Sequence, residues 1–188
     1  IRTVQNYFFL ATIGTMHHIL DSEDAPWAQA VSALASRVAG LSPSQLRFTL
    51  LEGRGRRFRY TATAGELAIS ATDGISACVG LHAYLREAVG LAVHWDSVTP
   101  LTVPHVVDAP PMEREARVAD QYMFNFCTFS YTMAHWGWEE WQREIDWMAL
   151  HGITMPLAAV GHEATLLDAY VGLGLEEAEA LDFIGANV

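Results

Sequence analysis

The run from Gln121 to Val160 constrains the fold of this chain more than any other part of its sequence. It begins with an aromatic-rich segment, Gln121–Tyr131, which we read as a strand whose successive side chains point to opposite faces. A helical pattern follows over Trp138–His151, and a second apolar run, Ile153–Val160, comes next. These spacings predict a strand, a helix and a strand. Such a unit usually carries two parallel strands.

The remainder of the chain divides around this unit. Two more helices are predicted after it, over Glu163–Leu173 and Glu176–Ile184. Before it, helical patterns cover Pro26–Ala39 and Ile75–Val89, where Asp73 is placed to cap the start of the second helix and Gly90 its end. Between these helices lie three short alternating segments that we interpret as hairpin-linked strands, and a fourth strand is expected after Gly90. In order, they are Arg47–Glu52, Arg57–Thr63, Leu67–Ala71 and Leu91–Trp95.

We therefore expect a small α+β domain over residues 26–104 and, from residue 121, alternating strands and helices. Prolines and mixed charges mark residues 105–120 as a linker. Residues 1–25 are left unassigned. Their apolar patch Tyr7–Ile13 weakly resembles a signal peptide, but His17 and His18 follow it without a clear cleavage site, so a stray upstream segment is favoured.

Composition excludes several classes of function. The chain has 188 residues, and its apolar content of 51% favours an ordered globular protein. Its net charge of −11 argues against a nucleic-acid binder, because a polyanion would be repelled. The arginines of residues 54–59 could suggest a nucleic-acid-binding strand, but a solvated hairpin is the simpler explanation for them. No run has the length of a membrane span. Cys78 and Cys127 have no metal-type spacing and are expected to be free thiols. Nothing indicates a cofactor, and a sugar or another small neutral ligand fits best.

The first predicted strand supplies two candidate ligand-binding residues. Asn125 and Cys127 share one face, opposite Tyr122, Phe124 and Phe126. If the bulky face packs under helices, Asn125 and Cys127 point inward near the carboxyl end of the strand, where parallel α/β enzymes place their active sites. The alternative is that Asn125 caps a turn and Cys127 fills the core.

Two further candidates lie in the turns that flank the predicted helix. Trp136 is the tryptophan best placed as a ligand wall, because helical spacing already explains Trp138 and Trp141 as core. Glu163 is either a pocket carboxylate or the first-turn acid of the next helix. The pair His162-Glu163 is not a zinc motif, since Leu166 stands where HExxH requires histidine. For His82, a satisfied core histidine is the expected role.

Longer stretches of the sequence resemble one known family. Asn125–Tyr131, Trp136–Trp141 and Arg143–Leu150 are similar to the α-N-acetylglucosaminidases of glycoside hydrolase family 89, and Gly80–Arg86 resembles the end of that family's N-terminal domain. The likeness covers about residues 26–184. The chain departs from the family pattern at Gly137, His151 and His162, where the family usually has Asp, Asn and Gln.

The resemblance implies an α+β N-terminal domain followed by the first two units of a (β/α)₈ barrel, truncated at residue 188. It also implies removal of terminal α-linked N-acetylglucosamine by two glutamates, with retention, and these glutamates are expected beyond Val188. The 188-residue chain alone is then expected to be inactive. In this family Asn125 and Cys127 match residues of the sugar pocket. Family members are secreted in bacteria or lysosomal in animals. A non-catalytic carbohydrate-binding module is the competing hypothesis.

Overall fold

The computed structural model describes residues 25, 27–96, 101–103, 105–157 and 162–185. By its contacts the chain forms two units. The larger unit contains residues 14–123 and 136–156, and the smaller unit contains residues 1–13, 124–135 and 157–188. The segment 1–25, which the sequence left unassigned, lies outside the described residues except for Ala25.

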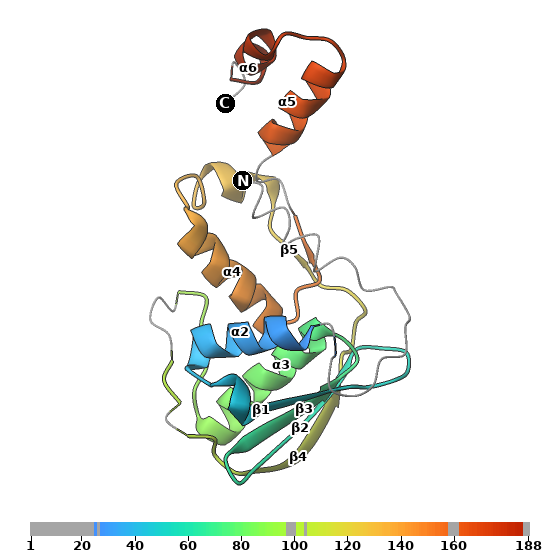
Figure 1. Cartoon of the computed structure of the whole chain (residues 1–188), viewed down its shortest axis with the longest axis vertical. Helices are drawn as coiled ribbons and strands as arrows, with labels where there is room; N and C mark the ends of the chain where they lie inside the picture. Colours follow the sequence, from blue (N-terminus) through green and yellow to red (C-terminus); the bar gives the residue numbers. More distant parts are fainter. Residues whose placement is uncertain (1–24, 26, 97–100, 104, 158–161, 186–188) are drawn as a thin grey trace. The chain divides into compact units, whose positions relative to one another are not determined.

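The larger unit is built on a four-stranded sheet with helices on one face (Figure 1). Its strands are β1 (Leu46–Leu50), β2 (Arg57–Thr63), β3 (Glu66–Ala71) and β4 (Ala109–Glu115), in the order β1-β3-β2-β4. The covering helices are α2 (Ala28–Ala39) and α3 (Gly74–Tyr84). The α+β architecture expected for this region is therefore observed.

The sheet is mixed, and only part of it is a hairpin. Ala64 and Gly65 have φ of 52° and 83°, so they form the two-residue turn with positive φ that joins antiparallel β2 and β3. β1 pairs with β3 in parallel. The expectation that all three early strands are linked by hairpins is thus wrong for β1, because a parallel partner cannot be reached through a tight turn.

One core holds the sheet and the helices together. Alternate residues of β2 and β3 turn inward, including Phe58, Tyr60, Leu67 and Ile69, all at most 5% exposed. α3 faces them with Leu81, which is fully buried. The period of two along each strand thus separates a buried face from a polar outer face.

The helix predicted over Ile75–Val89 is confirmed, with a change of pitch near its end. Asp73 accepts a hydrogen bond from the Ser76 backbone N–H at 2.8 Å and caps α3 as expected. Residues Leu85–Val89 continue as one π-helical turn, η2, and Gly90, at φ 78°, closes it. The last turn is therefore wider than an α-helix, a feature that periodicity alone does not reveal.

The strand predicted over Leu91–Trp95 does not form. The Leu91 N–H donates to the Leu85 carbonyl at 2.9 Å, and the Val93 N–H donates to Nε2 of His82 at 3.4 Å. The end of the preceding helix and a side chain thus take the donors that a sheet would need.

The segment 105–120, predicted as a linker, contributes the edge strand β4 instead. Met112 pairs with Tyr60 and Glu113 with Arg59. Pro110 and Pro111 misled the prediction, because proline is tolerated on an edge strand, where one side of the backbone has no partner strand. Upstream of β4, Tyr84 Oη accepts from the Val107 N–H at 2.8 Å and donates to its carbonyl at 3.1 Å, which fastens the segment to α3.

After β4 come β5 (Tyr122–Met123), α4 (Trp138–Leu150) and β6 (Met155–Pro156), and β5 pairs with β6 in parallel. The strand, helix, strand order and the parallel pairing are as predicted. The strands are shorter than expected. Residues 126–130 form a 3₁₀ turn, η3, rather than the continuation of a strand, and residues 158–160 lie outside the described part of the chain.

The smaller unit contains η3 and two helices that confirm the predictions, α5 (His162–Gly172) and α6 (Glu177–Gly185). Tyr170 and Phe183 pack edge to face between these helices, with ring centroids 5.4 Å apart. Several large apolar side chains of this unit are exposed, among them Phe126 (73%), Tyr131 (78%) and Leu173 (79%). Within the described residues, no helix combines the length and the apolarity needed to cross a bilayer.

Candidate functional site

Asn125 organises a short turn directly after β5. Its Oδ1 accepts from the backbone N–H groups of Cys127 and Thr128, at 2.9 and 3.1 Å. The Thr128 hydroxyl donates back to the Asn125 carbonyl at 2.8 Å. Asn125 therefore caps η3, which was the alternative role for this residue. Its amide nitrogen is the part of the side chain that this turn does not use.

The face assignment made from a continuous strand is wrong beyond Met123. Phe124 has φ of 77°, a left-handed conformation that is rare for a bulky residue, and it ends the extended run. The Phe124 ring packs edge to face on Phe129, with centroids 5.7 Å apart. Phe126 is 73% exposed instead of packed under helices. Cys127 is a free thiol, as expected, but it is exposed rather than part of the core.

Trp136 lies in the larger unit, just before α4. Its ring meets that of Trp141 edge to face, with centroids 5.1 Å apart, and Trp141 itself is only 5% exposed. Trp136 is half-buried. One part of its ring is therefore held by the core, and another part remains accessible.

Glu163 occupies the first turn of α5 and is exposed. Its Oε1 lies 3.5 Å from Nδ1 of His162. This is the position of a first-turn acid, where the partial positive charge of the helix start favours a carboxylate. Of the four predicted residues, the structure thus brings Asn125 and Cys127 together in one turn. Trp136 and Glu163 lie on other elements.

Sequence reasoning missed two buried acids in α4. Glu144 is 3% exposed and Asp146 is 6% exposed. Burial raises the pKa of Glu144 to about 7, against a hydrogen bond from the Trp95 side chain that lowers it. Oε1 of Glu144 is buried without a hydrogen-bond partner. The helical period could have found Glu144, since it lies on the stripe of Trp141 and Met148, at spacings of three and four.

Asp146 forms an ion pair that joins α4 to α2 of the N-terminal α+β domain, within the larger unit. Nε and Nη2 of Arg37, in α2, donate to its two carboxylate oxygens at 2.8 and 2.6 Å. Burial raises the pKa of Asp146, and the Arg37 hydrogen bonds and charge oppose that rise. No local pattern links residues 37 and 146, so the sequence alone gave no sign of this pair.

The buried His82 and the half-buried His151 form a second cluster between α3 and the end of α4. His82 is 7% exposed, as expected for a core histidine, and its ring lies 4.5 Å from that of His151. The His151 ring stacks on Trp147, with centroids 4.1 Å apart, and covers that tryptophan. Burial, together with the neighbouring His151 and Arg86, lowers the pKa of His82 to about 4.

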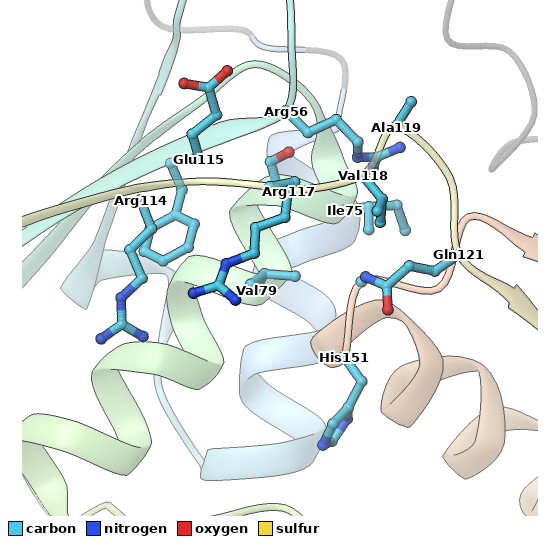
Figure 2. A pocket seen from close by; sticks show the side chains of 14 residues that line it. Arg56, Ile75, Val79, Arg114, Glu115, Arg117, Val118, Ala119, Gln121 and His151 are labelled. Carbon is cyan, nitrogen blue, oxygen red and sulfur yellow. The ribbon is translucent and has the colours of Figure 1, made fainter.

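A hollow of about 340 Å³ in the larger unit is lined by none of the four predicted residues. Figure 2 shows Arg117, Gln121 and His151 around it, over an apolar floor that includes Ile75 and Val79. Two arginines of its rim are already paired, Arg56 with Asp73 at 2.8 Å and Arg114 with Glu87 at 2.8 Å. Arg56 therefore pairs within the domain, on a segment that joins β1 to β2 without forming the expected hairpin, since these two strands are not neighbours in the sheet.

Comparison with known families matches both parts of the chain. The model for the "Alpha-N-acetylglucosaminidase (NAGLU) N-terminal domain" matches residues 29–107. The model for the "Alpha-N-acetylglucosaminidase (NAGLU) tim-barrel domain" matches residues 121–187. Both models describe consecutive domains of one family, in the order in which this chain carries them.

Individual relatives agree with these matches. The human protein named alpha-N-acetylglucosaminidase is 36% identical over 171 residues, which is 86% of this chain and 23% of that protein. Structures of the family 89 glycoside hydrolase of Clostridium perfringens share the fold. The one with the substrate GlcNAc-α-1,4-galactose has a TM-score of 0.71 at 19% identity. The one with 2-acetamido-1,2-dideoxynojirimycin also has a TM-score of 0.71, at 20% identity.

Each of these two structures matches 95% of this chain and 20% of the Clostridium chain. The chain thus spans about a fifth of the length of the relatives that it matches. The family resemblance of the tryptophan-rich run is confirmed, and the chain belongs to the α-N-acetylglucosaminidases of glycoside hydrolase family 89.

Proposed function

We propose that this chain is the N-terminal part of a retaining exo-glycosidase that hydrolyses terminal α-linked N-acetylglucosamine from glycans or glycoconjugates. One observation carries the proposal: two consecutive domains of the same enzyme family match residues 29–107 and 121–187 in the family's order. The substrate follows from the relatives, one of which was crystallised with GlcNAc-α-1,4-galactose as its substrate.

In this proposal the catalytic glutamates lie beyond residue 188. Retention needs two carboxyl groups about 5 Å apart, one acting as nucleophile and the other as acid and then base. The Clostridium enzyme crystallised with its substrate carried two glutamate-to-glutamine substitutions, which is consistent with two essential glutamates in that protein. Glu163 is not assigned either role, since it lies exposed in the first turn of a helix.

We further propose that residues 26–104, together with the edge strand β4 that follows them, form the N-terminal domain, and that residues 121–188 are the first two β/α units of the (β/α)₈ barrel. The parallel pairing of β5 with β6, with α4 between them in sequence, supports the barrel part of this proposal. A complete barrel takes about 250 residues, so this chain would supply only its beginning.

Asn125, Cys127, Trp136 and Glu163 are the proposed substrate-binding residues. Because the Asn125 Oδ1 already accepts two backbone N–H groups, its amide nitrogen is the group that would donate to a sugar hydroxyl. The exposed Cys127 thiol would form a small wall beside it. The accessible part of Trp136 would stack on the apolar face of a sugar ring. Glu163 would accept from hydroxyl groups.

The proposal is tested with the purified complete enzyme and with the 188-residue chain, using an aryl glycoside of α-linked N-acetylglucosamine. We expect the complete enzyme to release N-acetylglucosamine with retention and the 188-residue chain to release none. Release by the short chain would refute the assignment of the catalytic glutamates, and a complete enzyme inactive on this substrate would refute the substrate.

The alternative is a non-catalytic carbohydrate-binding module formed by the small domain. Against it, the sheet is completed by β4 and the domain is joined to α4 by the Arg37–Asp146 pair, so residues 26–104 are not a closed body. Calorimetric titration of the chain with N-acetylglucosamine-containing glycans separates the two. Binding that survives Asn125→Ala unchanged would favour the module.

A further inference from the structure

His82 joins three segments of the larger unit. It lies in α3, and its Nε2 accepts the Val93 N–H at 3.4 Å. Its ring also hydrogen-bonds to the backbone of Leu150, the last residue of α4. A neutral ring can accept at Nε2 and donate to the Leu150 carbonyl only with its proton on Nδ1. The network therefore assigns this tautomer to His82.

Contacts beyond the ring fix the end of α4 more firmly. The His151 ring lies 4.5 Å from His82 and stacks on Trp147 at 4.1 Å. Nδ1 of His151 lies 2.8 Å from the Trp147 carbonyl. The end of α4 is thus held against α3 by the tilted contact between the His82 and His151 rings, and the His151 ring is itself fixed by stacking on Trp147.

The end of α4 leads directly into the parallel strand pair. Gly152, at φ 79°, turns the chain, and the N–H groups of Thr154 and Met155 donate to the Gln121 carbonyl at 3.1 and 3.0 Å. β6 then pairs with β5 through Tyr122 and Met155. Only four residues separate Leu150 from Met155, so the place where α4 ends decides where β6 meets β5.

We propose that His82 is a positioning residue for the glycosidase reaction: it holds the end of α4 and so fixes the β5–β6 pair from which Asn125 follows. This inference rests on the proposed function. Asn125 comes two residues after β5, so the position of the strand pair sets the point from which the chain continues to Asn125. Displacements of about 1 Å can cost on the order of a hundredfold in rate.

The surroundings of His82 make this contact depend on its charge. His151 after α4, Arg86 in η2 and His94 in the segment after Gly90 all face the ring and disfavour its protonation, and burial lowers its pKa to about 4. A protonated ring would turn Nε2 into a donor opposed to the Val93 N–H. The contact is therefore made at neutral pH and lost at strongly acidic pH.

The experiment uses three variants of the complete enzyme. His82→Asn places its amide nitrogen where Nδ1 stands and keeps a donor for Leu150. His82→Gln places its polar atoms near Nε2 instead, and His82→Leu keeps neither. We expect kcat/KM on the aryl glycoside to fall about tenfold or more in His82→Leu and in His82→Gln, and by less than about threefold in His82→Asn. His105→Leu, at an exposed histidine, is the matched control.

A second measurement does not depend on activity. Amide hydrogen exchange of Thr154 and Met155 in the complete enzyme should quicken in His82→Leu and stay close to wild type in His82→Asn. Wild-type kinetics in a folded His82→Leu enzyme would overturn the inference, as would Asn and Leu variants with equal losses. An inactive wild-type enzyme with the expected exchange pattern would instead refute the proposed function and leave the structural link in place.

Discussion

Arg37 and Asp146 form a two-pronged ion pair across 109 residues of sequence, with donor–acceptor distances of 2.8 and 2.6 Å. Arg37 belongs to the first helix of the small domain, and Asp146 belongs to the helix between β5 and β6. The Asp146 side chain is 9% exposed and that of Arg37 is 33% exposed. The pair therefore fastens α4 to the N-terminal α+β domain within the larger unit.

Removing one partner of this pair should destabilise the larger unit more than removing a surface pair. For Asp146→Asn or Arg37→Met we expect the free energy of unfolding to fall by about 1.5–3 kcal/mol, the range for hydrogen bonds to charged groups. Denaturant titration followed by tryptophan fluorescence measures it, since all six tryptophans lie in the larger unit.

Arg59→Met is the matched control, because its pair with Glu113 is exposed on both sides, at 54% and 44%. Exposed pairs contribute about 0–1 kcal/mol. Equal losses in Arg37→Met and Arg59→Met would show that the Arg37–Asp146 pair is no more than a surface contact.

His82 and Glu144 should give the larger unit opposite responses to pH. The folded pKa of His82 is lowered from 6.5 to about 4, so its contribution to stability is present above pH 6.5 and is lost as pH falls towards 4. The folded pKa of Glu144 is raised from 4.5 to about 7, so its contribution is present below pH 4.5 and is lost as pH rises through 7. Between about pH 4.5 and 6.5, a rise in pH therefore increases stability through His82 and decreases it through Glu144.

Single substitutions should separate the two titrations. Relative to wild type, Glu144→Gln should gain stability as pH rises from 4.5 to 7, and His82→Asn should gain stability as pH falls from 6.5 to 4. Unfolding free energies measured at several pH values in each variant provide the check. Parallel pH curves for all three proteins would mean that neither group titrates abnormally in the folded chain.

The helices of this fold could be predicted from local signals, and the contacts between them could not. Asp73, Gly90 and the apolar period place α3 within a residue or two, because caps and periodicity are short-range effects. The strand expected after Gly90 is lost where the His82 side chain takes the Val93 N–H. Whether a side chain takes a backbone N–H from a sheet depends on tertiary contacts, which local sequence patterns do not reveal.

The candidate site shows the same limit. Asn125 and Cys127 were predicted as site residues because they stand near the end of a strand, and the structure places them after β5. Their inward orientation was derived from a period of two, which ends where Phe124 adopts positive φ. The positive φ of Phe124 thus invalidates the face assignment for the residues that follow it, and the sequence does not predict such an angle at a phenylalanine.

Replacing Asn125 tests its proposed role in the sugar pocket. Asn125→Asp keeps an acceptor for the Cys127 and Thr128 N–H groups but removes the amide donor, whereas Asn125→Ala removes both. In the complete enzyme we expect both variants to lose at least about tenfold in kcat/KM, equivalent to ~1.4 kcal/mol. Thr132→Ala, at an exposed position after η3, is the control. Unchanged kinetics for Asn125→Asp would remove the amide nitrogen from the sugar pocket.

At Gly80, α3 packs closely against the sheet, and substituting this residue should report on that packing. A Cβ at this position would lie 3.0 Å from Cδ2 and 3.2 Å from Cγ of Phe58, and 3.3 Å from Cγ2 of Ile69. Both neighbours are core side chains, 5% and 1% exposed, with little room to move. Alanine favours a helix over glycine by about 1 kcal/mol, but overpacking a core costs about 1–3 kcal/mol.

We therefore expect Gly80→Ala to lower the free energy of unfolding by about 1–2 kcal/mol, because the strain exceeds the gain in helix propensity. Gly172→Ala is the matched control: it is also a helical glycine, with no atom within 4 Å of the added methyl group, and it lies in the smaller unit. The tryptophan transition should shift for Gly80→Ala and stay in place for Gly172→Ala. A more stable Gly80→Ala chain would mean that α3 can move away from β2 and β3 at little cost, and that its packing against the sheet is looser than the contacts of Phe58 and Ile69 imply.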